Sequence, residues 1–491
     1  MGIWNCFILS IITKKINVDI LKPDLCILGG GAGGLSVAAG AVQMGASVVL
    51  IEAQKMGGDC LNSGCIPSKS LLASAKLAHL FRNAHQYGIQ STDPKIDFEK
   101  VMAHVHGVVQ TIGVHDSVER FEKLGVKVIE AQGTFADKNT VIAGGTTIKA
   151  RRFVIATGSL PFIPPIPGLD QVSFYTNETI FNLMQQPEHL IVIGGGAIGC
   201  ELAQAFLMLG SKVTILEAFH LLPRDEKDLV ALLRAHFLEQ GLNIHENIKI
   251  KNVQQQDQRM EIIFEKNGAQ HTMQGSHVLV ATGRRPSIEG LYLEKAGVRY
   301  SKKGIEVDTR LRTSNKHIFA IGDVIGGYQF THMANYHAGI VIRNALLRLP
   351  AKTNHRAIPW VIYTEPELAH VGLSNDEAIK IDSNAKILQW DFKENDRAQT
   401  EHQIFGKIKV MTTAKGKILG VSILGAYAGE LLMPWISAVQ EKKHIRSMTN
   451  FIVPYPTLSE ISKRVASEFY TPLLFSKHMR WIVKLLSYFN I

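Results

Sequence analysis

The feature that most constrains the fold of this chain is an internal repeat of about 30 residues. The first copy contains the glycine motif GGGAGG at residues 29–34, and the second contains GGGAIG at residues 194–199. In each copy an apolar segment precedes the glycines, and a second apolar segment ends in an acid 23 residues after the first glycine, at Glu52 and Glu217. The copies align without a gap at an offset of 165 residues. The repeat predicts two units of the same strand–turn–helix–strand design.

Each part of the repeated pattern has a physical role in binding a dinucleotide. The first glycine permits a tight turn, the second lets the backbone approach a pyrophosphate, and the third lets the helix pack on the strand. These glycines are Gly29, Gly31 and Gly34 in the first copy and Gly194, Gly196 and Gly199 in the second. Free amides at the helix N-terminus would hold the phosphates, and the acids Glu52 and Glu217 would bind a ribose. We therefore expect two dinucleotide sites; the alternative is that one copy is only a structural repeat.

The acid of the second copy also bears on which nucleotide binds there. Glu217 disfavours the 2′-phosphate of NADP, so we expect NAD(H) at this site. His220 lies three residues further along the chain and moderates that preference, which leaves NADP(H) open.

Two cysteines lie close together just after the first repeat, in the segment GGDCLNSGCIPSK at residues 57–69. On a regular helix Cys60 and Cys65 would stand about 140° apart around the axis with a rise of about 7.5 Å, too far for a disulfide. The segment is therefore expected to begin as a loop or a distorted turn. Lys69 follows Cys65 by four residues, and its charge would favour a thiolate. Zinc binding or a pair of inert core thiols is the alternative, but zinc needs about four ligands and the chain has no second close cysteine pair.

The composition is that of a globular α/β enzyme of several domains. The chain has 491 residues, of which 46% are apolar and 20% charged, which fits two to four domains. The net charge of +10 fits a solubilising surface better than an anionic partner, so we expect no nucleic acid partner. Five cysteines, an odd and sparse set, indicate a reducing compartment, and no segment reads as a membrane span or a signal peptide. We therefore expect a cytoplasmic protein.

The two fingerprints and the cysteine segment between them resemble the flavin-dependent pyridine nucleotide-disulfide oxidoreductases, the family of lipoamide dehydrogenase, glutathione reductase and mercuric reductase. The resemblance covers roughly residues 23–470. The other matching segments are ATGS at residues 156–159, ATGR at 281–284, IFAIGD ending at Asp323, FTHMANYHAG around His332, TEPELAHVG from Thr364, ENDRAQTE from Glu394 and PTLSE ending at Glu460.

The resemblance implies two bound cofactors, FAD at the first fingerprint and a nicotinamide nucleotide at the second, and no resident metal ion. Beyond the glycines, the implied FAD residues are Glu52, Lys69, Gly133, Thr157, Gly158, Ser159, Asp323 and His332, and the implied NAD residues are Glu217 and Gly283. Hydride would pass from nicotinamide to flavin, and electrons would then pass to a Cys60–Cys65 disulfide. Cys65 would be the thiolate against the flavin, and Cys60 the outer thiol that meets the substrate. Glu201 would be the partner of Lys69; a solvated helix charge is its alternative.

The last motif departs from the pattern of the disulfide reductases. Lipoamide dehydrogenase and glutathione reductase carry a histidine before the proline of this motif, paired with the glutamate five residues on, whereas this chain carries Tyr455. A phenol with a pKa near 10 is a poor base for thiol–disulfide exchange. Tyrosine here resembles mercuric reductase, whose acceptor is a metal ion held by thiolates. The paired C-terminal cysteines and the N-terminal CxxC domain of that enzyme have no counterpart in this sequence. Glu460 either orients a residue across a dimer or caps the local fold.

We therefore expect an FAD-dependent oxidoreductase that passes electrons from NAD(P)H through FAD and the cysteine pair to a metal ion or another small acceptor. Tyr455 and Glu460 join the cysteine pair, Lys69 and Glu201 as candidate catalytic residues. A dihydrolipoyl dehydrogenase of a keto-acid complex is one alternative. The other is not an enzyme: an FAD-binding redox sensor or interaction protein.

The expected fold class is α/β, with two Rossmann-like dinucleotide-binding domains and a C-terminal α+β dimerisation domain. The FAD domain is split by the inserted NAD domain. The expected boundaries are an N-terminal extension at 1–22, FAD domain at 23–160 and 290–353, NAD(P) domain at 161–289, dimerisation domain at 354–470, and a basic amphipathic tail at 471–491. A homodimer is expected because active sites of the family combine the cysteine pair of one subunit with the last motif of the other.

The tail carries an apolar stripe at helical spacing. Ile482, Leu485, Leu486 and Phe489 form the stripe, and Lys477, Arg480 and Lys484 lie on another face. Such a helix contacts a membrane surface, or packs on its own protein or on a dimer partner. The sequence favours packing, with the membrane as the alternative.

Overall fold

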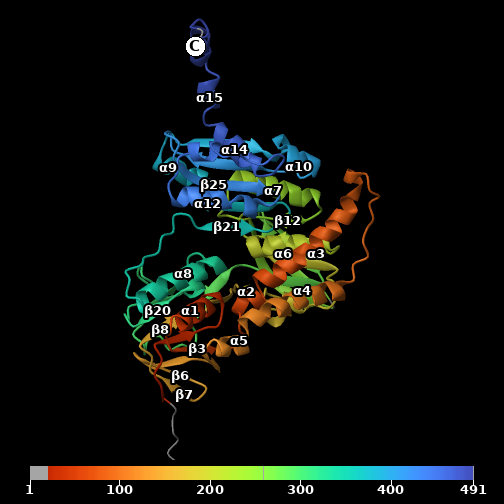
Figure 1. The fold of residues 1–491 in the computed structure, drawn as a ribbon. Coiled ribbons are helices and arrows are strands. Elements are labelled where there is room, and N and C mark those ends of the chain that lie inside the picture. The colour runs from red at the N-terminus through yellow and green to blue at the C-terminus, as the bar shows by residue number, and fades with distance from the viewer. Residues whose placement is uncertain (1–19, 258, 490–491) are drawn as a thin grey trace, which may run out of the picture.

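The computed structural model describes residues 20–257 and 259–489 of the chain. The predicted extension at residues 1–22 therefore lies almost wholly outside the described residues. The described part forms three units stacked along one direction, and the C-terminal tail projects from the last of them (Figure 1).

The first unit is built on a five-stranded parallel sheet with the order β20-β8-β2-β3-β4. Its central strands are short runs of buried apolar residues, as a parallel sheet covered on both faces requires. The last strand of the sheet comes from a segment far along the chain, so the chain leaves this unit and later returns to it. The strands are β2 (Leu25–Leu28), β3 (Val48–Glu52), β4 (Lys127–Glu130), β8 (Arg152–Ile155) and β20 (Ile318–Ala320).

Helices cover one face of this sheet and a small second sheet covers the other. Leu35 and Val37 of α1 and Ile340 of α8 share one apolar core, and Phe135 and Val141 of the small sheet share the core on the opposite face. The helices of the unit are α1 (Ala32–Gln43), α2 (Gly58–Asn62), α3 (Cys65–Asn83), α4 (Phe98–Gly113), α5 (Val118–Lys123) and α8 (Thr331–Ala345). The small sheet contains β1 (Ile20–Leu21), β5 (Thr134–Asp137), β6 (Thr140–Ala143) and β7 (Thr146–Ile148).

The second unit repeats the design of the first. Its parallel sheet has the order β12-β11-β10-β16, and every residue of β10 is buried. A three-stranded antiparallel sheet lies beside it. The elements are β10 (His189–Ile193), α6 (Ala197–Met208), β11 (Lys212–Leu216), α7 (Lys227–Glu239), β12 (Asn243–His245), β13 (Ile248–Gln256), β14 (Arg259–Lys266), β15 (Ala269–Gly275) and β16 (His277–Val280).

The chain crosses between these two units twice, and the two crossings lie side by side. β9 (Ser159–Pro161) leads out of the first unit and β17 (Arg284–Pro286) leads back, and the two strands pair antiparallel. This pairing places Arg284 and Ser159 together at the junction of the units. A short hairpin of β18 (Tyr300–Ser301) and β19 (Gly304–Ile305) follows before the first sheet is completed.

The third unit is a five-stranded antiparallel sheet with the order β21-β22-β25-β24-β23, covered by short helices. Its core contains the fully buried side chain of Trp435, whose indole nitrogen donates a hydrogen bond to Ser462. The strands are β21 (Pro359–Ile362), β22 (Glu367–Gly372), β23 (Lys386–Asp391), β24 (Lys407–Thr412) and β25 (Ile418–Gly425). The helices are α9 (Asn375–Ile381), α10 (Asp396–Thr400), α11 (Ala428–Leu431), α12 (Met433–Gln440), α13 (Arg446–Thr449) and α14 (Glu460–Ser467).

The tail follows as α15 (Thr471–Leu474) and α16 (Lys477–Leu486), and neither helix has a buried residue. The sequence favoured packing of this helix on its own protein or on a partner. Within the described chain it does not pack, because the tail extends away from the sheet of the third unit (Figure 1).

The predicted fold class is confirmed: two dinucleotide-type units, the first split by the second, precede an antiparallel α+β unit. The residue boundaries given for the domains stay predictions.

Candidate functional site

The glycines of both repeats adopt the conformations that the fingerprint requires. Gly29 and Gly194 have φ values of +109° and +112°, a region that favours glycine. A Cβ atom on Gly34 or Gly199 would lie 1.9 or 2.0 Å from the carbonyl oxygen of the first glycine, so only glycine lets helix and strand pack this closely. The third glycines thus serve packing.

The middle glycines leave open space where a ligand would lie. A Cβ atom on Gly31 would lie 3.8 Å from its nearest neighbour, the Cα atom of Gly58, and one on Gly196 would meet nothing within 4 Å. Both glycines line a large cavity. The turns are therefore shaped to admit a bulky group against the backbone, and they fit the pyrophosphates of two dinucleotides.

The two acids that end the repeats are held in the same way. Glu52 accepts hydrogen bonds from the amides of Gly30 at 2.5 Å and Gln54 at 2.7 Å. Glu217 accepts equivalent bonds from the second repeat, from Gly195 at 2.6 Å and Phe219 at 2.8 Å. Each carboxylate is fixed by two backbone donors at the edge of the cavity.

One continuous cavity of about 1440 Å³ connects the two fingerprints with the cysteine segment. Pockets for single small ligands usually have about 300–1,000 Å³, so this space is larger than one such ligand requires. Most of the predicted site residues line it: Gly29, Gly31, Glu52, Cys60, Cys65, Lys69, Gly133, Thr157, Gly158, Ser159, Gly194, Gly196, Glu201, Glu217, Gly283, Asp323 and His332. The structure thus brings residues from all three parts of the split arrangement to one space.

The cysteine segment consists of two helices with a break between them. Cys60 lies in α2 and Cys65 begins α3, and Ser63 and Gly64 separate the helices. Positive φ values of 87° at Gly57 and 60° at Gly58 shape the entry into α2. The predicted departure from a regular helix is therefore present.

The two thiols differ in acidity because each affects the other. A hydrogen bond from Cys60 lowers the pKa of Cys65 to about 6, and the Thr331 hydroxyl, 3.5 Å from the Cys65 sulfur, and the Lys69 charge act in the same direction. The same hydrogen bond, together with burial, raises the pKa of Cys60. The two cysteines are free thiols in this structure and not the predicted disulfide, and these shifts favour the thiolate at Cys65 over one at Cys60.

Lys69 and Glu201 form an ion pair beside the cysteines. The Lys69 ammonium lies 2.7 Å from Glu201 Oε2, and the Glu201 side chain is only 7% exposed. The other carboxylate oxygen accepts the backbone amide of Tyr363 at 2.9 Å, and the ammonium lies 4.4 Å from the centroid of the Tyr363 ring. Glu201 is buried, so it is not the solvated helix charge that the sequence left open.

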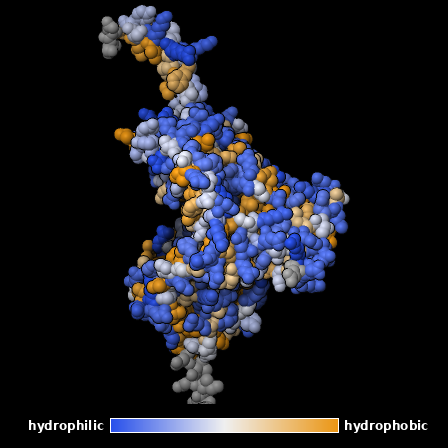
Figure 2. Space-filling model, turned by 90° about the vertical axis from the view of Figure 1, so that its right-hand side faces the viewer, coloured by the Kyte–Doolittle hydropathy of each residue, from blue (hydrophilic) through white to orange (hydrophobic). Residues whose placement is uncertain are grey.

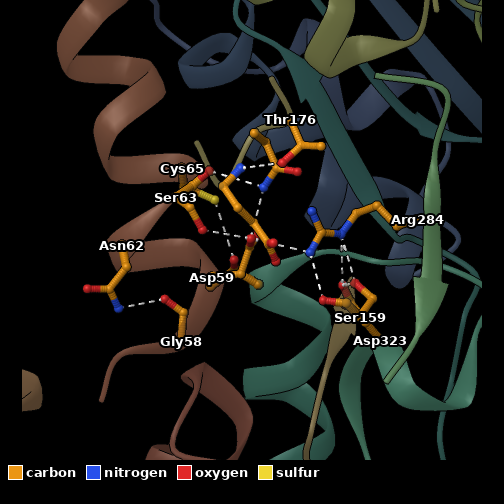
Figure 3. Close-up of polar contacts among 12 residues, drawn as sticks. Gly58, Asp59, Asn62, Ser63, Cys65, Ser159, Thr176, Arg284 and Asp323 are labelled. Atoms are coloured by element: carbon orange, nitrogen blue, oxygen red, sulfur yellow. Dashed lines mark hydrogen bonds and ion pairs between the residues drawn. The ribbon is translucent and has the colours of Figure 1, made fainter. Parts of the chain in front are cut away.

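Arg284 forms a contact network that the sequence did not predict (Figure 3). Its Nε donates to the Ser159 hydroxyl at 2.7 Å, and that hydroxyl donates to Asp323 Oδ2 at 2.6 Å. A second guanidinium nitrogen lies 3.3 Å from Asp59 Oδ1. Burial raises the pKa of Asp323. Arg284 thus ties the second unit to both parts of the first and to the residue before Cys60.

Asp59 is held by further donors from two elements. Its Oδ1 accepts a hydrogen bond from the Ser63 hydroxyl at 3.0 Å (Figure 3). It accepts another from the side-chain amide of Asn177 at 2.9 Å. The charge of Asp59 raises the pKa of both thiols. The sequence carries one signal of this network. Arg284 is the last residue of the ATGR motif and holds the same motif position as Ser159 in ATGS.

His332, Tyr455 and Glu460 have local partners that the sequence did not anticipate. His332 Nε2 lies 2.9 Å from the carbonyl oxygen of Pro359. Tyr455, which is 70% exposed, donates from its hydroxyl to Asp396 at 3.0 Å. Glu460 begins α14 and pairs with Arg464 at 2.7 Å, so within this chain it belongs to the local fold and does not bond to Tyr455. Neither Tyr455 nor Glu460 lines the cavity of its own chain.

Comparison with known proteins agrees with this geometry. The family model described as pyridine nucleotide-disulphide oxidoreductase matches residues 23–338, and the model for the dimerisation domain of that family matches residues 358–466. A mercuric reductase of Staphylococcus aureus is 33% identical over 449 residues, which is 91% of this chain and 82% of the relative. A dihydrolipoyl dehydrogenase of Bacillus subtilis is 34% identical over 445 residues, 89% of this chain and 96% of the relative.

A solved structure has the same fold over nearly its whole length. The Cu(II) complex of the HOCl-induced flavoprotein disulfide reductase RclA from Escherichia coli superimposes with a TM-score of 0.82 at 27% identity, covering 91% of this chain and 99% of that one. The resemblance read from the motifs is confirmed by these matches. The chain therefore belongs to the pyridine nucleotide-disulphide oxidoreductase family, and it is an FAD- and NAD(P)H-dependent flavoprotein disulfide oxidoreductase.

Proposed function

We propose that this protein is a homodimeric, NADH-dependent flavoenzyme that reduces a metal ion at the Cys60–Cys65 pair. The observation that carries the proposal is the single cavity in which two dinucleotide turns, a buried ion pair and an asymmetric pair of thiols meet. FAD, when bound, supplies a two-electron carrier between the nicotinamide and the sulfur pair. The first fingerprint, Glu52 and the Ser159–Asp323 contact would hold it.

NADH is the proposed donor because of how the Glu217 carboxylate is held. Two backbone amides fix it beside the second glycine turn, where we propose that the ribose of the nucleotide lies. An additional phosphate at that ribose would meet a fixed negative charge at short range, which costs binding free energy. The second fingerprint and Gly283 complete the proposed nucleotide site.

The reduced cysteine pair suits a soft metal ion as acceptor. The lowered pKa of Cys65 favours a thiolate there, and Cys60 supplies a second sulfur nearby. Thiolates are the ligands that soft ions select. When the pair closes to a disulfide it gives up two electrons and the remaining thiol proton. These two electrons lower the oxidation state of one metal ion by two, or of two metal ions by one each. The mercuric reductase relative and the Cu(II) complex of RclA support this class of acceptor.

The presence of Tyr455 favours a metal ion over a disulfide as the electron acceptor. The hydrogen bond to Asp396 raises the pKa of the Tyr455 phenol, which keeps it protonated. Disulfide exchange needs a group that takes and returns a proton near neutrality. Dihydrolipoyl dehydrogenase remains the second candidate, because the relative from Bacillus subtilis is 34% identical over 89% of this chain.

The proposal of a homodimer is based on the third unit. Residues 358–466 match the dimerisation domain of the family. The loop before α14 is exposed in the single chain, with Ile452 at 99% and Tyr455 at 70%. We propose that this loop meets the cysteine side of the partner subunit.

We also propose that the protein is cytoplasmic and contacts a membrane surface from there, because the tail exposes an amphipathic helix. Among the described residues, no helix has the length and apolar character that crossing a bilayer requires. The tail therefore supports binding to one surface of a membrane, without crossing it.

An acceptor screen with purified holoenzyme tests the proposal. NADH and NADPH oxidation is followed with Cu(II), Hg(II), lipoamide, glutathione disulfide and a soluble quinone, in wild type and in Cys60→Ser and Cys65→Ser variants. We expect NADH to be preferred and a metal ion to be reduced only when both cysteines are present. Fast lipoamide turnover with slow metal reduction would establish the second candidate instead, and turnover of the quinone alone would contradict both candidates.

A further inference from the structure

The last two helices of the chain expose apolar side chains that nothing in the described structure covers. Leu473 and Phe475 around α15 are 62% and 68% exposed, and Trp481, Val483 and Leu486 of α16 are 59%, 61% and 59% exposed. In Figure 2 this segment stands clear of the body and carries hydrophobic and hydrophilic residues together. Large apolar side chains gathered on one exposed element mark a contact surface.

The side chains of α16 divide into two faces. At 100° per residue, Leu485, Ile482, Leu486, Met479 and Val483 occupy one arc of about 160°, and His478 is the one polar residue within it. Lys477, Arg480 and Lys484 occupy an arc of about 60° on the opposite side. Trp481 lies on the boundary, about 40° from Lys477. An indole at such a boundary has its apolar body and its N–H donor placed for the region between acyl chains and water.

The charges indicate what the helix contacts. No acid follows Glu468 in the sequence, while the tail carries Lys477, Arg480 and Lys484. A second copy of the helix would bring like charges together, and an anionic lipid surface would neutralise them. The family's dimerisation model ends at residue 466, ahead of the tail.

We propose that residues 471–489 bind the surface of anionic phospholipid membranes. The apolar face of α16 lies at the acyl boundary and its basic face among the headgroups. A homodimer carries two tails, so two weak contacts act together. This inference rests on the membrane contact proposed above and names its lipid class; it depends neither on the proposed reaction nor on the acceptor.

Vesicle flotation of the full-length holoenzyme tests the inference. Vesicles of neutral phosphatidylcholine are compared with vesicles containing one quarter phosphatidylglycerol, at low and high salt. We expect binding only to the anionic vesicles, weaker at high salt. The triple variant Lys477→Gln, Arg480→Gln, Lys484→Gln should bind at least about 100-fold more weakly, from a factor of about five for each of the three basic residues of one tail.

Two further variants test the apolar face of α16 and control for a general loss of positive charge. Ile482→Glu with Leu486→Glu should abolish flotation without affecting the fold, because α16 has no buried residue. A matched charge control, Lys95→Gln with Lys302→Gln and Lys303→Gln, changes exposed lysines elsewhere and should bind as wild type. NADH oxidation with a soluble acceptor should be the same in all variants.

Three results would overturn the inference. These are absence of flotation, equal binding to neutral and anionic vesicles, and a tail-dependent rise in molar mass by light scattering without vesicles, which would assign the tail to a second copy. Because activity with soluble acceptors is measured separately, failure of the membrane contact and failure of the proposed reaction are distinguishable.

Discussion

Replacing Cys60 by alanine should raise the pKa of Cys65. The first cause of the low value at Cys65 is the hydrogen bond from Cys60, and burial opposes it. Without the donor, the Thr331 hydroxyl and the Lys69 charge remain, so the value should move back toward the ordinary thiol value of about 8.5.

The size of the expected change follows from the fraction of Cys65 that is ionised. With a pKa of about 6, about 90% of Cys65 is thiolate at pH 7, whereas an ordinary thiol is about 3% thiolate. The thiolate with the higher pKa is intrinsically more nucleophilic by about tenfold, which offsets most of that difference in a rate measured at pH 7. The pH at which the alkylation rate reaches half of its plateau is therefore the informative quantity.

Alkylation of the reduced, anaerobic protein by iodoacetamide from pH 4.5 to 10 gives this midpoint, with the Cys65 peptide quantified by mass spectrometry. Cys26 and Cys200 are fully buried and should stay unlabelled. Thr331→Val should raise the midpoint less than Cys60→Ala, and Thr111→Val, which removes an exposed hydroxyl bonded only within α4, should leave it unchanged. A midpoint near 6 in Cys60→Ala, or one above 8 in wild type, would refute the reasoning.

Four other changes test the site. Lys69→Met leaves the buried Glu201 carboxylate without its partner and should lower the free energy of unfolding in urea by about 2–3 kcal/mol. This is less than the loss for a fully buried pair, because the Lys69 side chain is 35% exposed. Adding Glu201→Leu should recover most of the lost stability. Asp59→Asn removes a charge that raises the pKa of both thiols, so the alkylation midpoint of Cys65 should fall; an unchanged midpoint would exclude that electrostatic role. Glu217→Ser should raise the NADPH-to-NADH ratio of kcat/KM at least about tenfold, and an unchanged ratio would remove the basis for NADH preference. Tyr455→His should increase lipoamide reduction at least about tenfold by supplying a base, whereas an equal or lower rate would contradict the role given to the phenol.

The sequence predicts the dinucleotide turns because their chemistry is local. Gly29 and Gly194 must adopt positive φ, and the acids that end the repeats must reach back to the glycine amides. These requirements fix residue types at fixed spacing, which makes them visible without a structure. The break between Cys60 and Cys65 is visible for the same reason.

The Arg284 network depends on contacts between distant segments. It joins residues 59, 159, 284 and 323, and those segments meet only after β9 and β17 pair across the two units. No spacing in the sequence encodes such a meeting. The sequence does not predict the partner of Tyr455 for a similar reason, because Asp396 begins α10, 59 residues earlier in the chain.

The tail shows another limit of periodicity. The spacing of Ile482, Leu485 and Leu486 predicts a helix with an apolar face, and α16 has that form. Periodicity does not tell what covers the face, since core, partner and lipid all select the same pattern. The exposure of the helix is information that only the structure supplies.

The most direct test of the central claim is an anaerobic titration of purified holoenzyme with NADH, followed by absorbance. If electrons pass from NADH through FAD to the Cys60–Cys65 pair, a long-wavelength charge-transfer band between the Cys65 thiolate and the flavin should grow in wild type. The band should be absent in Cys65→Ser while the flavin is still reduced. A band of full strength in Cys65→Ser, or a flavin that NADH does not reduce, would contradict the claim.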